Sequence, residues 1–546
     1  MNLSECLKML HSYIGTDCDK QDYIVYIQTL VMRAPMTPEE EKEDDMKKQW
    51  LRALLRRRIA VIVLLLLQIG FILAMVISGS RSVAFIDILF KGISLLVVLS
   101  IISKKDKGGY KLAWTILVMT FPLFGGLFYL LIKGQYSTEP FGKRARKIEE
   151  KARPLYALPG TATVNDRAML YLDKTAGFPA YQGSETEYLS PGERKFERLL
   201  EELEKAEHYI FLEYFIIQEG KMWNSILDVL KRKAAEGVKV RVIYDDVGCF
   251  MLLPNDYPKQ LKQCGIECVV FNPFKPLLTA VQNNRDHRKI VSIDGKVAFT
   301  GGINLADEYI NAYEKHGHWK DASVMIRGKA AWSFTLMFLQ MWELIAGCEE
   351  NYIDYFPKGE NFFVDDGLVQ PYADSPLDRE NVGEHVYLQI INSARRYVYI
   401  NTPYLIIDDS MLSALCLAAK SGVDVRIVTP HKWDKRFVHV TTRSYYRDLI
   451  EAGVKIYEYT PGFMHAKTFV ADDEIATVGT VNLDYRSLYL HFECGVRLYQ
   501  CRAVSQLKED FLKTLESCHL VAAEECRSNV FARIAGQLLR LFAPLM

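Results

Sequence analysis

The sequence has no repeated CxxC motif and no cluster of cysteine with histidine, although it contains 11 cysteines among 546 residues. A structural zinc site or a disulfide framework needs regular spacing of such residues, so the cysteines predict neither. We interpret them as mostly buried thiols, which favours a reducing compartment around the soluble part of the chain.

An excess of charge of one sign is also lacking. Lysine plus arginine and aspartate plus glutamate number 67 each, which gives a formal net charge of zero. Proteins that bind nucleic acid carry a basic field, so no nucleic-acid partner is expected. A signal peptide with a small-residue cleavage site is missing as well, because residues 1–50 are polar and end in an acidic patch at residues 39–45.

Long apolar runs are present, and they are concentrated in residues 51–135. Residues 59–78 and 112–132 carry no charged side chain, and each would reach about 30 Å as a helix, the thickness of a bilayer core. We predict that both span a membrane. A third run, residues 82–102, carries Asp87 and Lys91, which could pair across one helical turn, so this run either spans or is re-entrant. The expected protein has two or three spans in the cell membrane.

The charges beside these runs leave the side of the C-terminal part open. Arginines 56–58 and the lysines between residues 104 and 111 both favour the inside, so three spans would place the C-terminal part outside. The basic residues between 143 and 147 and the free cysteines favour the opposite side. A start of translation at Met46, directly before the first run, is an alternative to the long N-terminal extension.

Two segments of the remaining chain, residues 195–330 and 380–500, repeat the same order of amphipathic helix and apolar strand. The helix–strand pairs are 196–206 with 209–217 and 226–235 with 238–244 in the first segment, and 384–394 with 397–407 and 411–421 with 423–428 in the second. This alternation predicts an α/β fold with a mixed sheet flanked by helices. The duplication predicts two tandem domains related by a pseudo-twofold.

The expected domain organisation has five parts: a polar extension (1–50), a transmembrane helical region (51–135), a first repeat domain (136–355), a second repeat domain (356–525) and a C-terminal amphipathic helix (526–546). In that last helix, Phe531, Ile534 and Leu538 fall on one face, and Arg533, Gln537 and Arg540 fall on another. It would either lie in a membrane interface or pack on the preceding domain.

Each repeat contains the pattern H-x-K-x4-D followed by an asparagine. The residues are His287, Lys289, Asp294 and Asn304 in the first repeat, and His465, Lys467, Asp472 and Asn482 in the second. Histidine and asparagine are seventeen positions apart in both copies. One copy would be a weak signal, but two copies with identical spacing predict one site that uses both.

These residue types suit transfer of a phosphoryl group. We expect H-x-K to lie on a strand, whose period of two places histidine and lysine on the same face. One imidazole can attack phosphorus while the other protonates the leaving alkoxide and later activates the incoming hydroxyl. The lysines would supply positive charge and the asparagines hydrogen-bond donors to the non-bridging oxygens, and no metal or cofactor is needed. Asp294 and Asp472 lie where a hairpin turn is expected, so we expect them to fix the turns.

A nucleophilic histidine must be held in one tautomer, which usually requires a carboxylate or carbonyl on its other ring nitrogen. Asp321 and Glu493 lie on apolar stretches downstream of the two motifs, and they are the candidates for orienting the histidines. Either could instead be an ordinary charge at a strand edge.

With its paired HKD motifs, the chain resembles the phospholipase D superfamily and, over about residues 50–546, the bacterial cardiolipin synthases. Further matching motifs are Gly301-Gly-Ile-Asn304, Trp319-Lys-Asp321, Asn401-Thr-Pro-Tyr404 and Asn482-Leu-Asp-Tyr-Arg-Ser487. The resemblance implies a covalent phosphohistidine intermediate without a metal. It also implies transfer of a phosphatidyl group from one phosphatidylglycerol to another, which releases glycerol. His287 would be the nucleophile and His465 the acid and base, although the roles could be exchanged.

Other functions remain open at this point. A hydrolytic phospholipase D and a phosphatidyltransferase with another alcohol acceptor would use the same motifs, because acceptor choice depends on pocket shape. A non-catalytic module that binds anionic lipid is the alternative of a different class, and the intact motifs count against it. The N-terminal extension and the charged middle run depart from the family pattern and bear on membrane topology. The oligomeric state is not predicted.

Overall fold

The structure is a computed structural model of the chain. It describes residues 81–545 apart from gaps at 106, 135–138, 165, 275–279, 359–365, 379 and 527–529, together with residues 63, 66–70, 73 and 77. The chain forms two compact units, Met1–Phe71 and Ile72–Met546, and the described residues of the first unit are helical. The expected polar extension, the alternative start at Met46 and most of the first expected span lie outside the described residues.

The second unit begins with three helices, α4 (Arg81–Ser103), α5 (Gly108–Thr120) and α6 (Pro122–Gly134). Within the described part of the chain, only α4 contains a helical segment, Phe85–Ser103, that is long and apolar enough to cross a membrane, and just 22% of its most apolar window is buried. Asp87 and Lys91 form the expected ion pair on this helix, at 2.7 Å.

The prediction of one continuous spanning helix over residues 112–132 is wrong. The run is broken at Phe121, whose φ of −126° and ψ of 76° are not helical. Proline disfavours the helical conformation of the residue before it and has no N–H to donate, so Pro122 ends α5 and starts α6. Gly125 then allows α6 to pack closely on α5, because a Cβ there would lie 2.5 Å from the Leu117 carbonyl oxygen.

The segment between α4 and α5 contacts the second repeat directly. Lys107 pairs with the buried Glu384 at 2.7 Å and with Asp408 at 3.4 Å. Its ammonium also lies 4.8 Å from the centre of the Tyr489 ring. The apolar helices are therefore attached to the repeat whose last strands carry part of the candidate site.

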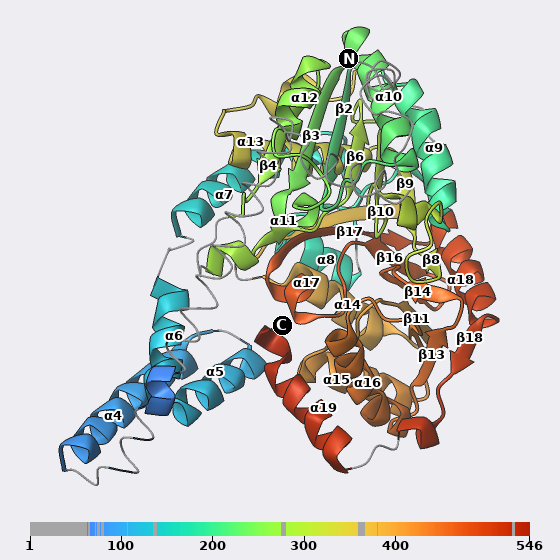
Figure 1. Cartoon of the computed structure of the whole chain (residues 1–546). Helices are drawn as coiled ribbons and strands as arrows, with labels where there is room; N and C mark the ends of the chain where they lie inside the picture. Colours follow the sequence, from blue (N-terminus) through green and yellow to red (C-terminus); the bar gives the residue numbers. More distant parts are fainter. Residues whose placement is uncertain are drawn as a thin grey trace, which may run out of the picture. The chain divides into compact units, whose positions relative to one another are not determined.

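The first repeat forms a seven-stranded sheet in the order β1-β9-β7-β6-β2-β3-β4. Strands β9, β6, β2, β3 and β4 of this sheet are labelled in Figure 1. Its strands are β1 (Ser184–Leu189), β2 (Tyr209–Tyr214), β3 (Lys239–Asp245), β4 (Glu267–Phe271), β6 (Ile290–Ile293), β7 (Val297–Gly301) and β9 (Ser323–Gly328). The helices that pack on it are α9 (Gly192–Glu204), α10 (Lys221–Ala235), α12 (Tyr257–Gln263) and α13 (Ala331–Ala346). Strands β2, β3 and β4 are parallel, whereas β6 is antiparallel to β2. This is the mixed sheet expected from the sequence.

The second repeat forms a sheet in the order β10-β17-β16-β15-β11-β12-β13-β18. Its strands are β10 (Leu368–Asp374), β11 (Tyr397–Asn401), β12 (Asp424–Pro430), β13 (Lys455–Tyr459), β15 (Thr468–Ala471), β16 (Ile475–Gly479), β17 (His491–Tyr499) and β18 (Cys518–Leu520). The main helices of this repeat are α14 (Val382–Ser393), α15 (Asp409–Lys420), α16 (Arg436–Glu451) and α18 (Arg502–Leu515). The order β9-β7-β6-β2-β3-β4 has its counterpart in β17-β16-β15-β11-β12-β13, so the predicted duplication is confirmed.

The two repeats are joined by a shared core and by two short parallel strand pairs. Apolar residues of β6, β7 and β9 pack with residues of β15, β16 and β17 in one cluster. In addition, β5 (Arg285–Asp286) pairs with β17, and β14 (Gly462–Met464) pairs with β8 (His318–Lys320). Each short pair connects the segment just before one H-x-K motif to a strand of the other repeat.

The remaining elements lie around these sheets. They are α7 (Glu139–Ala152), α8 (Arg167–Lys174), α11 (Asp246–Cys249), α17 (Tyr485–Tyr489) and α19 (Val530–Phe542). Helix α19 packs on α16 through Arg540, which contacts Asp448 at 2.7 Å and the Ser444 hydroxyl at 3.0 Å. Phe531 and Ile534 on its other face are 83% and 52% exposed. The helix therefore packs on the domain, as one alternative predicted, while Phe531 and Ile534 stay exposed among the described residues.

Candidate active site

His287 is positioned by strand pairing between the two repeats. Arg285 and Asp286 pair with His491 and Phe492 at the start of β17, and the His287 amide donates to the Phe492 carbonyl at 2.9 Å. The histidine of the first repeat is therefore attached to a strand of the second.

His465 is held in the reciprocal way. The strand before it, β14, pairs with β8, and the His465 amide donates to the Lys320 carbonyl at 2.7 Å. Both H-x-K triplets lie between strands, and the prediction that they lie on a strand is wrong. The physical reason is that each triplet lies between two different strand pairings. In the first repeat, pairing with the other repeat ends before His287 and the chain joins its own sheet at β6. In the second repeat, the corresponding points are His465 and β15.

The two orienting carboxylates are exchanged between the repeats. Glu493 of the second repeat lies 3.0 Å from His287 Nδ1 with each of its oxygens, and Asp321 of the first repeat lies 2.6 Å from His465 Nδ1. Both carboxylates are fully buried. An ionised carboxylate only accepts hydrogen bonds, so each Nδ1 carries a proton and each Nε2 keeps its lone pair.

The motif lysines lie beside the histidines. Lys289 donates to the His287 carbonyl at 2.7 Å, and the Lys467 ammonium lies 2.9 Å from Nδ1 and 3.1 Å from Nε2 of His465. Burial lowers the pKa of Lys289 to about 8 and that of Lys467 to about 7. A bound anion would therefore raise the pKa values of both lysines, because its negative charge favours their protonated form.

Burial and the lysines also act on the histidines. The pKa of His287 falls well below its usual value because the ring is buried and the charges of Lys289 and Lys467 oppose a second positive charge. Burial, with Lys467, lowers the pKa of His465 to about 4, although Asp321 opposes this shift. Both imidazoles are neutral near pH 7 in the free protein, as a nitrogen nucleophile requires.

The two motif asparagines are buried and already hydrogen-bonded. The Asn304 side-chain oxygen accepts from the Ile216 amide at 3.1 Å, and its amide group donates to the Tyr309 hydroxyl at 2.7 Å. The Asn482 amide group donates to the Ser487 hydroxyl at 3.1 Å. These contacts position the loops after β7 and β16, and contact of the asparagines with substrate stays a prediction.

Asp294 and Asp472 hold the backbone at the start of the central strands. Asp294 accepts from three consecutive amides, 207 to 209, at 2.7–2.8 Å, and Asp472 accepts from amides 395 to 397 at 2.7–3.0 Å. Both aspartates have positive φ at hairpin turns, 52° and 56°. These contacts anchor β2 and β11 and leave the histidines, lysines and buried carboxylates as the groups gathered at the site.

Aromatic rings form the walls around the histidines, and of these only Trp319 belongs to a motif recognised in the sequence. The ring centres of Trp319 and Tyr309 lie 5.2 and 5.4 Å from that of His465. Phe215 and His491 lie 5.2 and 5.6 Å from His287. Trp319 and His491 each precede an orienting carboxylate by two residues, and that spacing places them on the same side of the chain as the carboxylate.

One group of potential metal ligands occurs among the described residues. His287, His491 and Glu493 have ligand atoms within 4.8 Å of one another. The same lysine charges that lower the pKa of His287 would repel a divalent cation there. The residues therefore fit an anion better than a metal ion.

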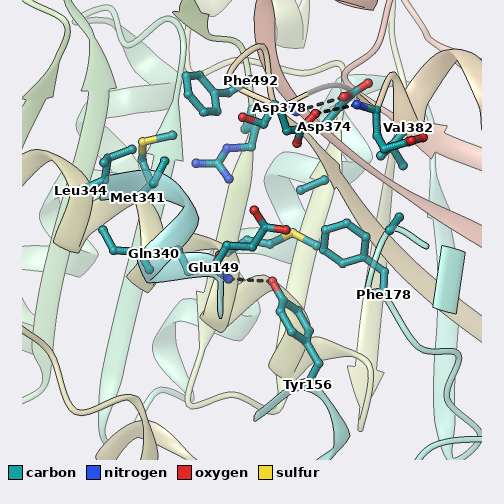
Figure 2. A pocket seen from close by; sticks show the side chains of 18 of the residues that line it. Glu149, Tyr156, Phe178, Gln340, Met341, Leu344, Asp374, Asp378, Val382 and Phe492 are labelled. Carbon is teal, nitrogen blue, oxygen red and sulfur yellow. Dashed lines mark hydrogen bonds between the residues drawn. The ribbon is translucent and has the colours of Figure 1, made fainter. Parts of the chain in front are cut away.

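A cavity of about 190 Å³ lies on the opposite side of β17 from the histidines. Figure 2 shows the side chains that line it, among them Phe492 with Asp374 and Asp378 nearby. Phe492 faces this cavity because it alternates along β17 with Glu493, and Arg288 also lines the cavity. Burial raises the pKa of Asp378 to about 6 and that of Asp374 well above its usual value. An acidic cavity without either histidine does not suit a phosphodiester.

Comparison with known families gives two matches. The family described as "Cardiolipin synthase, PLD-like domain" matches residues 199–341 and 387–515, which contain the two motifs. The family described as "Phospholipase_D-nuclease N-terminal" matches residues 92–134, from the second half of α4 to the end of α6.

Similar proteins cover most of the chain. A cardiolipin synthase of Geobacillus kaustophilus is 36% identical over 462 residues, which are 83% of this chain and 92% of that protein. An uncharacterized protein of Streptococcus mutans is 44% identical over 80% of this chain and 96% of its own length. The solved structure of a phosphatidylserine synthase from Haemophilus influenzae, 15% identical, matches 70% of this chain and 98% of its own with a TM-score of 0.52, which supports the fold.

Proposed function

The chain belongs to the family of cardiolipin synthases with phospholipase D-like domains, and on this premise we propose that it transfers a phosphatidyl group between two phosphatidylglycerol molecules. The observation that carries the proposal is the exchange of carboxylates, which builds one site from both repeats. Two oriented imidazoles and two buried lysines in one site match the needs of a double displacement at a phosphodiester. The domain boundaries given above are part of the same proposal.

The first step forms the covalent intermediate. His287 Nε2 attacks phosphorus, because Nδ1 carries the proton that Glu493 accepts. The bond from phosphorus to the glycerol oxygen breaks, and His465 donates a proton to the leaving oxygen. The phosphodiester brings negative charge to the site, which raises the pKa of His465 from about 4 and allows it to carry that proton.

The second step reverses these roles. The glycerol hydroxyl of a second phosphatidylglycerol loses its proton to His465 and attacks phosphorus, and the bond from phosphorus to His287 Nε2 breaks. The products are cardiolipin and glycerol, and both histidines return to their starting states. Lys289 and Lys467 stabilise the charge on the non-bridging oxygens in both steps, a contribution usually worth a few kcal/mol per donor.

We further propose a multi-pass membrane attachment with the site facing the lipid. Helix α4 supports it because its apolar surface is largely uncovered. Helix α16 begins directly after Lys435, whose charge contributes to the lowered pKa of His287, and its first turns expose Phe437 and Val440 by 72% and 41%. Helix α19 packs against the same helix, and its other face exposes further apolar side chains. We call Phe437, Val440, Phe531, Ile534 and Leu538 the apolar rim.

A product assay tests the proposed function. The purified full-length protein is incubated with phosphatidylglycerol vesicles, and lipids and free glycerol are quantified by mass spectrometry. We expect equal amounts of cardiolipin and glycerol from wild type and neither from His287→Ala or His465→Ala. Phosphatidic acid in place of cardiolipin would show a hydrolase, and no product with any alcohol acceptor would show a lipid-binding module.

A further inference from the structure

The two catalytic halves differ at one pair of equivalent positions. Because the His287 amide bonds to Phe492 and the His465 amide bonds to Lys320, these two residues are structural counterparts. The preceding residues, His491 and Trp319, are therefore counterparts as well. One histidine of the site has a titratable ring beside it, and the other has an indole.

The contacts of His491 fix its tautomer. Arg486 Nε donates to His491 Nε2 at 3.4 Å, and a guanidinium has no acceptor, so Nε2 accepts and Nδ1 carries the proton. That proton points toward Glu493, whose Oε1 lies 3.7 Å from His491 Nδ1. The His491 side chain is 11% exposed, and among the described residues its Nδ1 has no hydrogen-bond partner.

Glu493 is thus surrounded by three donors. It accepts from His287 Nδ1 at 3.0 Å and from the Thr480 hydroxyl, and His491 Nδ1 is the third, one short movement away. Shortening 3.7 Å to an ordinary N–H···O distance requires a shift of roughly 1 Å. Asp321, in contrast, accepts from His465 and from the Ala322 amide, and Trp319 directs its ring toward His465.

We propose that His491 is a positioning residue that keeps the Nδ1 proton on His287 while the phosphatidyl group is bound to Nε2. Attack by neutral His287 leaves a positively charged N-phosphoryl imidazolium, and Glu493 is the base that could remove its Nδ1 proton. A bond from His491 to Glu493 spreads the carboxylate charge over one more donor and lowers its proton affinity. The protonated ring is the better leaving group, so the second step stays fast.

This role gives the two histidines different tasks and rests on the proposed function. Transfer through His287 forms the phosphorus–Nε2 bond and breaks the phosphorus–glycerol bond, and His465 gives up one proton. In the second step the acceptor oxygen replaces Nε2 on phosphorus, and His465 recovers that proton. The Nδ1 proton of His287 does not move in either step. Trp319 does not perform the same service for Asp321, because its indole N–H has no hydrogen-bond partner among the described residues and its ring lies against Phe463 and His465.

The test compares His491→Phe with His491→Asn in the full-length protein. The asparagine amide nitrogen is attached to Cγ, as Nδ1 is in histidine, so asparagine keeps a donor toward Glu493, whereas phenylalanine keeps a ring without one. Rapid-quench measurements give the rate of glycerol release, which reports formation of the intermediate, and the rate of its transfer to a second phosphatidylglycerol. Trp319→Phe is the matched control in the other half.

We expect His491→Phe to slow breakdown of the intermediate by about tenfold relative to its formation, so that phosphatidyl-enzyme accumulates. His491→Asn should restore most of the wild-type ratio, and Trp319→Phe should leave that ratio unchanged. An equal ratio in wild type and both His491 variants would overturn the inference. If wild type itself forms no intermediate or no cardiolipin, the proposed function fails instead. Thermal unfolding of each variant separates these outcomes from loss of fold.

Discussion

Replacing Glu493 by glutamine should slow transfer through His287 in a way that the structure allows to be calculated. The carboxylate is fully buried, contacts His287 Nδ1 at 3.0 Å with both oxygens, and also accepts from Thr480. A hydrogen bond to a charged group contributes about 1.5–3 kcal/mol, and about 1.4 kcal/mol corresponds to a tenfold change in rate. Glu493→Gln should therefore lower the rate of glycerol release by about 10- to 150-fold. If the amide N–H₂ faces Nδ1 and reverses the tautomer, the loss approaches about 10⁴-fold.

The assay uses two substrates in single-turnover experiments. Phosphatidylglycerol needs a general acid for its alkoxide leaving group, whereas a phosphatidyl ester of p-nitrophenol does not. Glu493→Gln should be slow with both substrates because His287 is the proposed nucleophile. Asp321→Asn should be slow with phosphatidylglycerol and largely recover with the nitrophenyl ester because His465 is the proposed proton donor.

The control for this pair is Glu458→Gln. Glu458 is also buried and lies 2.9 Å from a histidine, His431, which is outside both motifs. We expect its rates to stay within about twofold of wild type, as for other changes away from the site. If the nitrophenyl ester restores the rate of Glu493→Gln but not that of Asp321→Asn, the roles of the two histidines are exchanged. Wild-type rates for both variants would refute the orienting role.

Three further results are expected. In denaturant titrations, Asp294→Ala should lower the free energy of unfolding by about 3 kcal/mol and Asp472→Ala by about 1 kcal/mol. The loss is smaller for Asp472 because the backbone amides that would lose their hydrogen bonds to it are mostly exposed and can bind water instead. The KM for phosphatidylglycerol should rise by at least about tenfold from pH 7 to pH 9. The motif lysines, with pKa values of about 7 and 8, lose over this range the positive charge that attracts an anionic lipid. A constant KM would contradict this expectation. Phe437→Asp or Phe531→Asp should weaken activity on vesicles and spare activity on a soluble short-chain lipid, whereas equal losses on both would count against the apolar rim.

Much of the fold follows from local patterns in the sequence. The helices and strands of both repeats were predicted near their observed positions, as for the strand expected at 238–244 and found at Lys239–Asp245. The strand expected at 397–407 ends at Asn401, because the chain bends at Pro403, which has no N–H to donate to a neighbouring strand. Apolar period and turn residues define an element, but where it ends depends on the residues that it meets in the folded chain.

The site was predicted as a set of residues and not as an arrangement. Sequence spacing identified Asp321 and Glu493, but their exchange between the repeats depends on the pairing of β5 with β17 and of β8 with β14. Three of those strands, β5, β8 and β14, are two or three residues long and carry no pattern of their own. His491 was missed for a related reason, since its importance arises only from its distance to Glu493 and to the ring of His287.

In the membrane region, the sequence predicts one long helix where the structure has two short ones. Composition alone treats residues 112–132 as one apolar span, and only the conformation at Phe121 and Pro122 divides it into α5 and α6. Each of these helices has 13 residues and would reach about 20 Å, which is shorter than a bilayer core. Within the described residues, α4 is the helix with the length and composition of a span.

The most direct test of the central claim is to identify the residue that carries the phosphatidyl group. The protein is mixed with short-chain phosphatidylglycerol, quenched at alkaline pH within milliseconds to preserve phosphohistidine, and digested for peptide mass spectrometry. We predict a phosphatidyl adduct on His287 of the wild type and no adduct in His287→Ala. A variant without the His465 imidazole should still form the adduct on His287 when the nitrophenyl ester is the donor. An adduct on His465, or active enzyme with no adduct on either histidine, would contradict the account.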